Sequence, residues 1–157
     1  MKQLEKLKLN ILRISIGLVY LFFGFIKFIP NLSPAEDLAT NTIGILTFGI
    51  LPSSLSLIVL AVVETLIGVF LIANWKPRIF ISIAIVHILF TFTPLFLLPE
   101  EIFGKGELVF TLAGQYIVKN IIILSALLSL KIDLNNNLEK TASTEPSSEQ
   151  LIAIKNQ

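Results

Sequence analysis

The sequence predicts an all-α membrane protein, a four-helix bundle whose helices run alternately up and down. Of the 157 residues, 54% are hydrophobic and only 15% are charged, whereas about a quarter of a soluble domain is charged. Mean hydropathy is +0.84. The apolar residues form four blocks, at 11–29, 55–73, 79–98 and 108–130, each near the roughly 20 residues that a helix needs to cross a bilayer. We therefore expect one four-span domain over residues 1–131.

The first block follows a basic segment that carries Lys2, Lys6 and Lys8, and it ends at Pro30. A cleavable signal peptide has an apolar core of about 7–15 residues and a small-residue cleavage site. This block is longer, contains Lys27 and lacks an A-x-A signal. We therefore expect it to be retained as the first span.

The connection between the first two spans, 30–54, is longer than a turn. Ser33-Pro34-Ala35-Glu36 matches a capping box with proline at the first helical position. We expect a short helix to start at Pro34. Residues 43–51 are too apolar for a free loop, so this segment is expected to lie in the membrane interface or to fold back over the end of the bundle.

The distribution of basic residues predicts the orientation. One side carries Lys2, Lys6, Lys8, Lys76 and Arg78. The opposite side has Lys105 against the acidic residues Glu36, Asp37, Glu100, Glu101 and Glu107. Both termini are therefore expected to be cytoplasmic. Residues 132–157 are polar and small, with three consecutive asparagines at 135–137, which predicts a disordered cytoplasmic tail.

Three ionisable side chains, Glu64, His87 and Lys119, lie within about two residues of the midpoints of the last three spans. A charge at this depth costs on the order of 3 kcal/mol on insertion scales unless it is paired or hydrated. Two interpretations stay open. Glu64 and Lys119 form a buried ion pair that only joins two helices, or the three groups line a polar cavity that binds or protonates a ligand. His87 alone could be a core histidine hydrogen-bonded to Thr91.

Helical spacing places small and polar residues on one face of each span. The four stripes are Arg13, Gly17, Tyr20, Gly24 and Lys27; Ala61, Glu64, Thr65 and Gly68; His87, Thr91 and Pro94; and Thr111, Gln115, Lys119, Ile122 and Ala126. In lipid, such stripes mark helix–helix contacts. Lys27 is expected one to two turns nearer the outer face than Glu64, and Arg13 near the cytoplasmic headgroups.

Lys27 and Lys119 outnumber Glu64, which leaves one positive charge in the bundle while His87 is neutral. Glu36 or Asp37 could neutralise Lys27, or Lys27 could extend to the headgroups. Otherwise the site suits an anionic or electron-rich ligand, such as a quinone carbonyl or an oxyanion. The expected ligand-binding residues are Lys27, Glu64, His87, Gln115 and Lys119, on a polar or packing face with Tyr20, Gly24, Gly68 and Thr91. With one histidine and no cysteine, no metal site is expected.

Five segments follow one another in order: LRISIGLVYLFFGFIK at 12–27, SPAEDLA at 33–39, Glu64 followed by Gly68, TFTPL at 91–95 with PEE at 99–101, and GQYIVKN at 114–120. Together they resemble the DoxX-like family of small bacterial membrane proteins. The resemblance implies a four-span bundle in the bacterial cytoplasmic membrane, with Glu64 and Lys119 as pattern residues. His87 departs from the glutamine expected there. The family name comes from a subunit linked to thiosulfate:quinone oxidoreduction, and other members are tied to oxidative-stress complexes.

We expect an accessory membrane subunit that binds a small quinone-like ligand and works with a redox partner protein or as a homo-oligomer. A proton-coupled transporter of a small solute or anion, and a structural scaffold subunit, are the alternatives. An independent redox enzyme is the least supported class, because the chain has no thiol, nucleotide-binding fingerprint or haem-type histidine pair. The net charge of +1 gives no basic field for nucleic acid. The expected cofactor-like ligand is a bound quinone. No intrinsic cofactor is expected.

Overall fold

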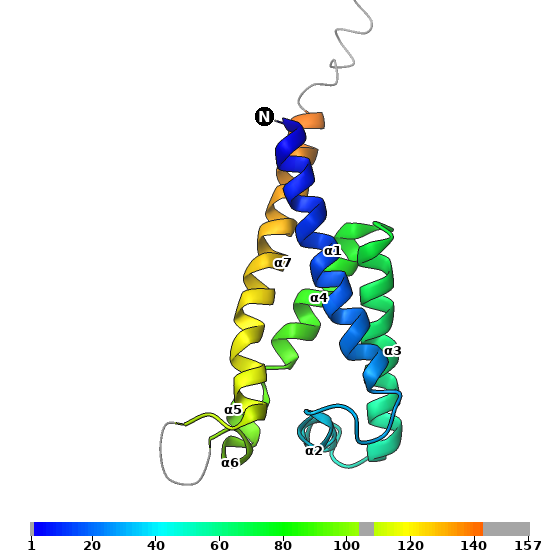
Figure 1. The fold of residues 1–157 in the computed structure, drawn as a ribbon, viewed down its shortest axis with the longest axis vertical. Helices are drawn as coiled ribbons and strands as arrows, with labels where there is room; N and C mark the ends of the chain where they lie inside the picture. Colours follow the sequence, from blue (N-terminus) through cyan, green and yellow to red (C-terminus); the bar gives the residue numbers. More distant parts are fainter. Residues whose placement is uncertain (1, 104–108, 143–157) are drawn as a thin grey trace, which may run out of the picture.

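A computed structural model describes residues 2–103 and 109–142, and this part of the chain is built from helices without a β-strand. Figure 1 shows their arrangement. In chain order they are α1 (Lys2–Ile26), α2 (Glu36–Leu46), α3 (Ser53–Ile72), α4 (Pro77–Phe90), α5 (Pro94–Leu97), α6 (Pro99–Ile102) and α7 (Leu112–Ala142). The predicted all-α class is therefore confirmed.

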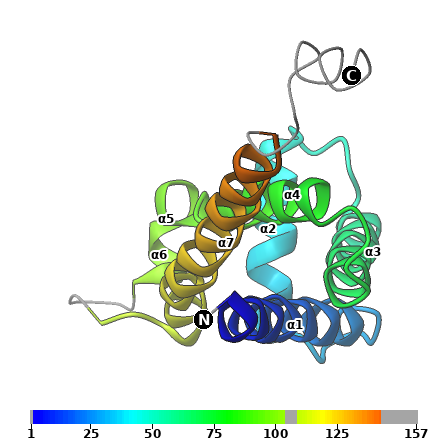
Figure 2. The same ribbon diagram turned by 90° about the horizontal axis from the view of Figure 1, so that it is seen from above.

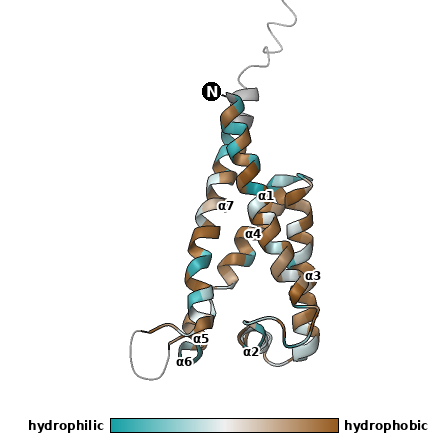
Figure 3. Ribbon diagram, in the orientation of Figure 1, coloured by the Kyte–Doolittle hydropathy of each residue, from teal (hydrophilic) through white to brown (hydrophobic). Residues whose placement is uncertain are grey.

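Three helical segments among the described residues are long and apolar enough to cross a membrane: Gln3–Ile26, Ser53–Ile72 and Pro77–Leu97. Apolar residues cover most of α3 and α4, while polar residues gather where α1 begins and α7 ends (Figure 3). This pattern supports the predicted membrane class. With 31 residues, α7 is a fourth long helix.

Several expected boundaries differ from the structure, and two of the differences change the architecture. The block at 79–98 is not one continuous helix, because α4 ends at Phe90 and α5 begins at Pro94, which has no backbone N–H to continue the ladder. The hydroxyls of Thr91 and Thr93 bond back to carbonyls of α4 at this break. At the other end of the chain, α7 continues to Ala142, so the residues from 132 to 142 are helical and not a disordered tail. Residues 143–157 lie outside the described residues.

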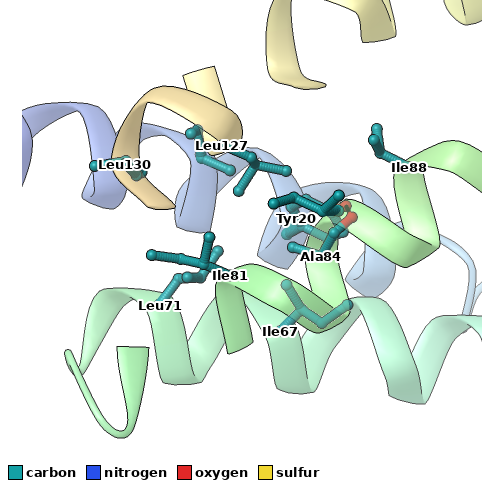
Figure 4. Close-up of a cluster of buried hydrophobic side chains, with 10 residues drawn as sticks. Tyr20, Ile67, Leu71, Ile81, Ala84, Ile88, Leu127 and Leu130 are labelled. Atoms are coloured by element: carbon teal, nitrogen blue, oxygen red, sulfur yellow. Dashed lines mark hydrogen bonds between the residues drawn. The ribbon is translucent and has the colours of Figure 1, made fainter. Parts of the chain in front are cut away.

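The four long helices form a ring in the order α1, α3, α4, α7, and α2 lies across it (Figure 2). Near the start of α1 the ring is tight, and toward α2 the helices α1 and α7 diverge (Figure 1). At the tight end, buried apolar side chains from all four helices fill the centre, among them Ile67, Ile81 and Leu127 (Figure 4). A smaller cluster around Leu38, Ile102 and Ile117 lies at the α2 end.

Glycines allow α1 and α3 to approach to backbone contact. A Cβ added to Gly68 would lie 2.5 Å from the backbone nitrogen of Leu21, and one added to Gly24 would lie 2.6 Å from that of Thr65. Such close approach gives van der Waals packing that does not depend on the hydrophobic effect, which is weak between helices in lipid. The predicted small-residue stripe thus serves as the α1–α3 contact.

Arg13 lies at the end of α3 and donates hydrogen bonds to its last turn. Its side chain is 8% exposed. The guanidinium donates hydrogen bonds to the carbonyl oxygens of Leu71 and Ile72, the latter at 3.1 Å. These carbonyls belong to the last turn of α3, where the helix dipole favours a cation. The buried charge therefore ties α1 to the C-terminal end of α3.

The helix between the first two long helices begins at Glu36, two residues after the expected start at Pro34. The expected capping box is absent, because no side chain caps the helix and a Glu36 carboxylate oxygen accepts from the Asn31 N–H at 2.9 Å. Leu38 and Thr42 are buried and fix one face of α2 on the bundle. Beyond its end, Phe48 and Ile50 are 91% and 81% exposed.

Thr111 sets the start of α7. Its hydroxyl accepts a hydrogen bond from the Gly114 N–H at 3.1 Å and donates one to the Glu101 carbonyl at 2.7 Å. Replacing Thr111 by alanine is expected to lower the free energy of unfolding by about 0.5–2 kcal/mol, because a helix N-cap is lost. Thr40→Ala is the control, since the Thr40 hydroxyl only bonds back within its own helix. Thermal or denaturant unfolding in detergent measures both, and equal effects would contradict the assignment.

Candidate functional site

A cavity of about 220 Å³ lies inside the wider half of the ring. Its walls come from α1, α2, α3, α4 and α7, and they are mainly apolar. The polar lining is concentrated in a few side chains: Tyr20, Ser33, Thr42, Lys27, Glu64, His87, Thr91, Tyr116, Lys119 and Asn120. Apolar walls with few polar groups are typical of small-molecule sites. The volume lies below the roughly 300–1,000 Å³ of drug-sized pockets.

Glu64 is held by two partners in this wall. Its Oε2 lies 2.6 Å from Lys27 Nζ, and both side chains are less than a tenth exposed, at 9% for Glu64 and 7% for Lys27. Its Oε1 lies 3.5 Å from Nε2 of His87. Lys27 also donates to the carbonyl of Phe23 at 3.2 Å. The carboxylate therefore bridges α1 and α4 from its position in the middle of α3.

The Glu64–Lys119 ion pair, one of the two interpretations that the sequence left open, is not formed, since Lys27 pairs with Glu64. Lys27 was expected one to two turns nearer the outer face, either beside Glu36 or Asp37 or extended to the headgroups. The glycine contact explains the difference. Gly24, one turn before Lys27, packs directly on Thr65 and the Cβ of Glu64, which brings the lysine stem alongside the carboxylate.

His87 links this pair to Tyr20. The Tyr20 hydroxyl lies 3.2 Å from Nδ1 of His87 and 3.1 Å from the carbonyl oxygen of Ala84. A hydroxyl has one proton to donate. When it donates to Ala84, Nδ1–H must donate to the tyrosine oxygen, and an imidazolium then also donates through Nε2 to Glu64. When His87 is neutral and donates through Nε2, the hydroxyl donates to Nδ1. The direction of the bond between Tyr20 and His87 therefore depends on whether Nδ1 of His87 carries a proton.

Lys119 lies at the rim of the cavity and is exposed. Its Nζ is 3.7 Å from the centre of the Tyr116 ring and 5.0 Å from that of the Phe23 ring. These two rings meet edge to face at 6.2 Å. Among the described residues, Lys119 has no carboxylate within ion-pair distance. Two aromatic faces hold the ammonium but leave its charge unpaired.

The remaining predicted residues divide into three groups. Tyr20 and Thr91 line the cavity with the ionisable residues. Gly24 and Gly68 lie in the α1–α3 contact and support the ion pair from outside. Gln115 is exposed, donates to the Phe110 carbonyl at 3.3 Å and is not part of the cavity lining.

Sequence reasoning left out Asn120, Tyr116 and Phe23. Asn120 donates through Nδ2 to the Thr91 hydroxyl at 3.0 Å and joins α7 to the end of α4. Tyr116 and Lys119 are three residues apart, a spacing at which helical side chains meet. That spacing was the available signal for an aromatic ring under the lysine. Phe23 and Lys27 are four residues apart, and the Lys27 Nζ lies 5.9 Å from the centre of the Phe23 ring, but the contacts of Phe23 with α7 had no sequence signal.

The predicted excess of one positive charge is present in the structure, but Lys27 and Lys119 have exchanged their expected roles. Lys27 is neutralised by Glu64, and Lys119 carries the unpaired charge. Lys119, Asn120 and the Tyr116 hydroxyl are hydrogen-bond donors, so this side of the cavity can hold an electron-rich oxygen. The opposite wall can relay a proton through Tyr20, His87 and Glu64. No protein-family model, curated protein or solved structure matches this chain.

Proposed function

We propose that this protein is an accessory membrane subunit that binds a small, electron-rich lipophilic molecule of the quinone class. The observation that carries this proposal is the unpaired Lys119 ammonium on the rim of an otherwise apolar cavity. A quinone carbonyl accepts a hydrogen bond and attracts a cation without bringing a full charge into the bilayer. Its flat ring is suited to the Phe23 and Tyr116 faces.

The volume of the cavity and the residues at its rim favour a quinone that has a single-ring head and an apolar tail. About 220 Å³ accommodates a head smaller than a drug-sized ligand. Val19, Leu46 and Phe90 line the cavity and are also 38%, 42% and 57% exposed. A tail that leaves between such side chains meets lipid, not water.

The proposed membrane arrangement has four spans, formed by α1, α3, α4 with α5, and α7, which run alternately up and down. Lys6, Lys8, Lys76 and Arg78 mark the cytoplasmic end, and α2 lies in the opposite interface with Phe48 as an anchor. This arrangement, the bacterial cytoplasmic membrane and membership of the DoxX-like group are part of the same proposal.

A partner protein of a redox or stress-response system supplies the electrons, because the chain has no cysteine for thiol chemistry.

A binding titration tests the proposal. Protein purified in mild detergent is examined by mass spectrometry for co-purified quinones and titrated with a short-tailed ubiquinone analogue by calorimetry. Lys119→Met is expected to weaken binding by about tenfold or more, because a charge-assisted hydrogen bond is lost. Lys131→Met is the control, since Lys131 is exposed on the same helix and outside the cavity lining. Wild-type protein that neither carries nor binds a quinone, or equal binding by Lys119→Met, would contradict the proposal.

The contacts that lead from Tyr20 through His87 and Glu64 to Lys27 favour a second candidate, proton-coupled transport of a small solute or anion. Glu64 and His87 are the groups that would exchange a proton with a passing solute. Flux driven by a pH gradient into liposomes tests it. Transport requires that His87→Phe abolish the flux while the protein remains folded, and a wild type without flux excludes it.

A further inference from the structure

A second cavity, of about 230 Å³, lies at the tight end of the ring, between α1, α7 and the α3–α4 turn. It is separate from the first cavity and shares no lining residue with it. One part of its wall is apolar, from Leu9, Pro77, Ile81, Leu130 and Leu134, and the rest is polar, from Lys6, Asn10, Arg13, Asn74 and Asp133. The wall is therefore amphiphilic.

Positive charge predominates in the polar part. Lys6 and Arg13 are both cations, and Asp133 is the carboxylate among these lining residues. Asp133 already has an interaction partner in the structure. Arg13 is buried, and within residues 2–103 and 109–142 its guanidinium donates to oxygens of neutral groups, namely two carbonyls of α3 and the Asn10 amide at 3.4 Å. A helix C-terminus supplies only about half an elementary negative charge, so the buried guanidinium can still accept an anion.

The position of this cavity along the bundle matches the headgroup layer. The α3–α4 turn beside it carries Trp75 and Lys76, with the lysine Nζ 4.7 Å from the centre of the tryptophan ring. Tryptophan and basic residues concentrate at the membrane–water interface. Ile81 and Leu130, which belong to the buried core, extend the cavity wall toward the hydrocarbon.

We infer that this second cavity binds the phosphodiester headgroup of an anionic phospholipid. Lys6 and Arg13 attract the phosphate, and the Asn10 and Asn74 amides are donors beside it. The upper part of an acyl chain lies along Leu9 and Leu134. Basic pockets between membrane helices bind anionic headgroups in this way. Because its walls come from α1, α7 and the α3–α4 turn, the bound lipid ties together elements that are distant in sequence.

The experiment compares two phospholipids and inorganic phosphate as ligands, and it compares two lysine variants of α1. Purified protein in a neutral detergent is mixed with phosphatidylglycerol, phosphatidylcholine or inorganic phosphate, and its thermal unfolding midpoint and lipid occupancy by native mass spectrometry are measured. Phosphatidylglycerol is expected to raise the midpoint, and the other two are not. Lys6→Gln is expected to weaken phosphatidylglycerol binding about fivefold. Lys8→Gln removes the same charge from an exposed neighbour outside the lining and is expected to leave binding unchanged.

Each alternative result overturns the inference. Equal weakening by Lys6→Gln and Lys8→Gln would indicate general attraction to the basic end and no defined site. Equal stabilisation by inorganic phosphate would indicate a free-anion site, and equal stabilisation by phosphatidylcholine would show that the anionic headgroup is not recognised. Both variants are expected to leave quinone binding at the first cavity unchanged, because neither lysine lines it, so the two sites are tested separately.

Discussion

Replacing Lys27 by methionine is expected to lower the free energy of unfolding by about 3–5 kcal/mol, because Glu64 is left as a buried carboxylate without its lysine. Glu64→Leu is expected to cost a similar amount, since it leaves the Lys27 ammonium unpaired. The double variant Lys27→Met/Glu64→Leu is expected to lie near the wild type, because the two buried charges leave together. Unfolding in detergent, with all four proteins compared in one double-mutant cycle, gives the coupling energy.

Lys119→Met provides the decisive comparison. Lys119 is exposed and has no ion pair among the described residues, so its loss is expected to change stability by less than about 0.5 kcal/mol. Coupling of Glu64 to Lys119 in place of Lys27 would show that the 2.6 Å pair is not the dominant interaction. Additive effects of Lys27→Met and Glu64→Leu would show the same.

Gly68→Ala is expected to destabilise the protein by about 1–3 kcal/mol, because its methyl group overpacks a backbone contact. The new Cβ would lie 2.5 Å from the Leu21 nitrogen and 2.8 Å from the Gly17 oxygen. Backbone atoms cannot rotate away as a side chain does, so α1 and α3 must separate. The separation also draws Lys27 away from Glu64.

Gly44→Ala is the matched control for this prediction. Gly44 lies within α2, and a Cβ there would meet nothing within 4 Å. Alanine is favoured over glycine in a helix, so this variant is expected to stabilise the protein by about 0.5–1 kcal/mol. The same unfolding assay compares the two. Similar effects of both substitutions would mean that the α1–α3 contact is looser than the structure has it.

Local physics explains which parts of the fold were predictable. Apolar blocks of helical length predict the long helices, because lipid forces each backbone to satisfy its own hydrogen bonds. The same reasoning failed at the end of α7, where residues 132–142 are polar but continue a helix that is already nucleated. It also failed at 91–93, where threonine hydroxyls and Pro94 end α4, although the residues on both sides are apolar.

The residues that line the site were predictable from the sequence. Which of them pair with one another was not. Helical spacing placed Tyr20, Lys27, Glu64 and His87 on inward faces, and all four line the cavity. Spacing says nothing about the relative height of two helices. The interpretation in which Glu64 pairs with Lys119 assumed that the two residues lie at equal depths in the membrane. The glycine contacts between α1 and α3 set the position of one helix relative to the other along the bundle axis. This position places Lys27 beside Glu64.

The sequence by itself thus determined the membrane class of the protein, three of the helices that can cross a bilayer and the excess of lysine over glutamate in the apolar segments. These properties follow from composition and from periodicity along one helix. The tertiary structure alone decided which lysine neutralises Glu64, which one remains unpaired at the rim, and that Arg13 is buried at the end of α3. Ion pairs depend on distances between helices, and those distances are set by backbone contacts at glycines far from the charges in sequence.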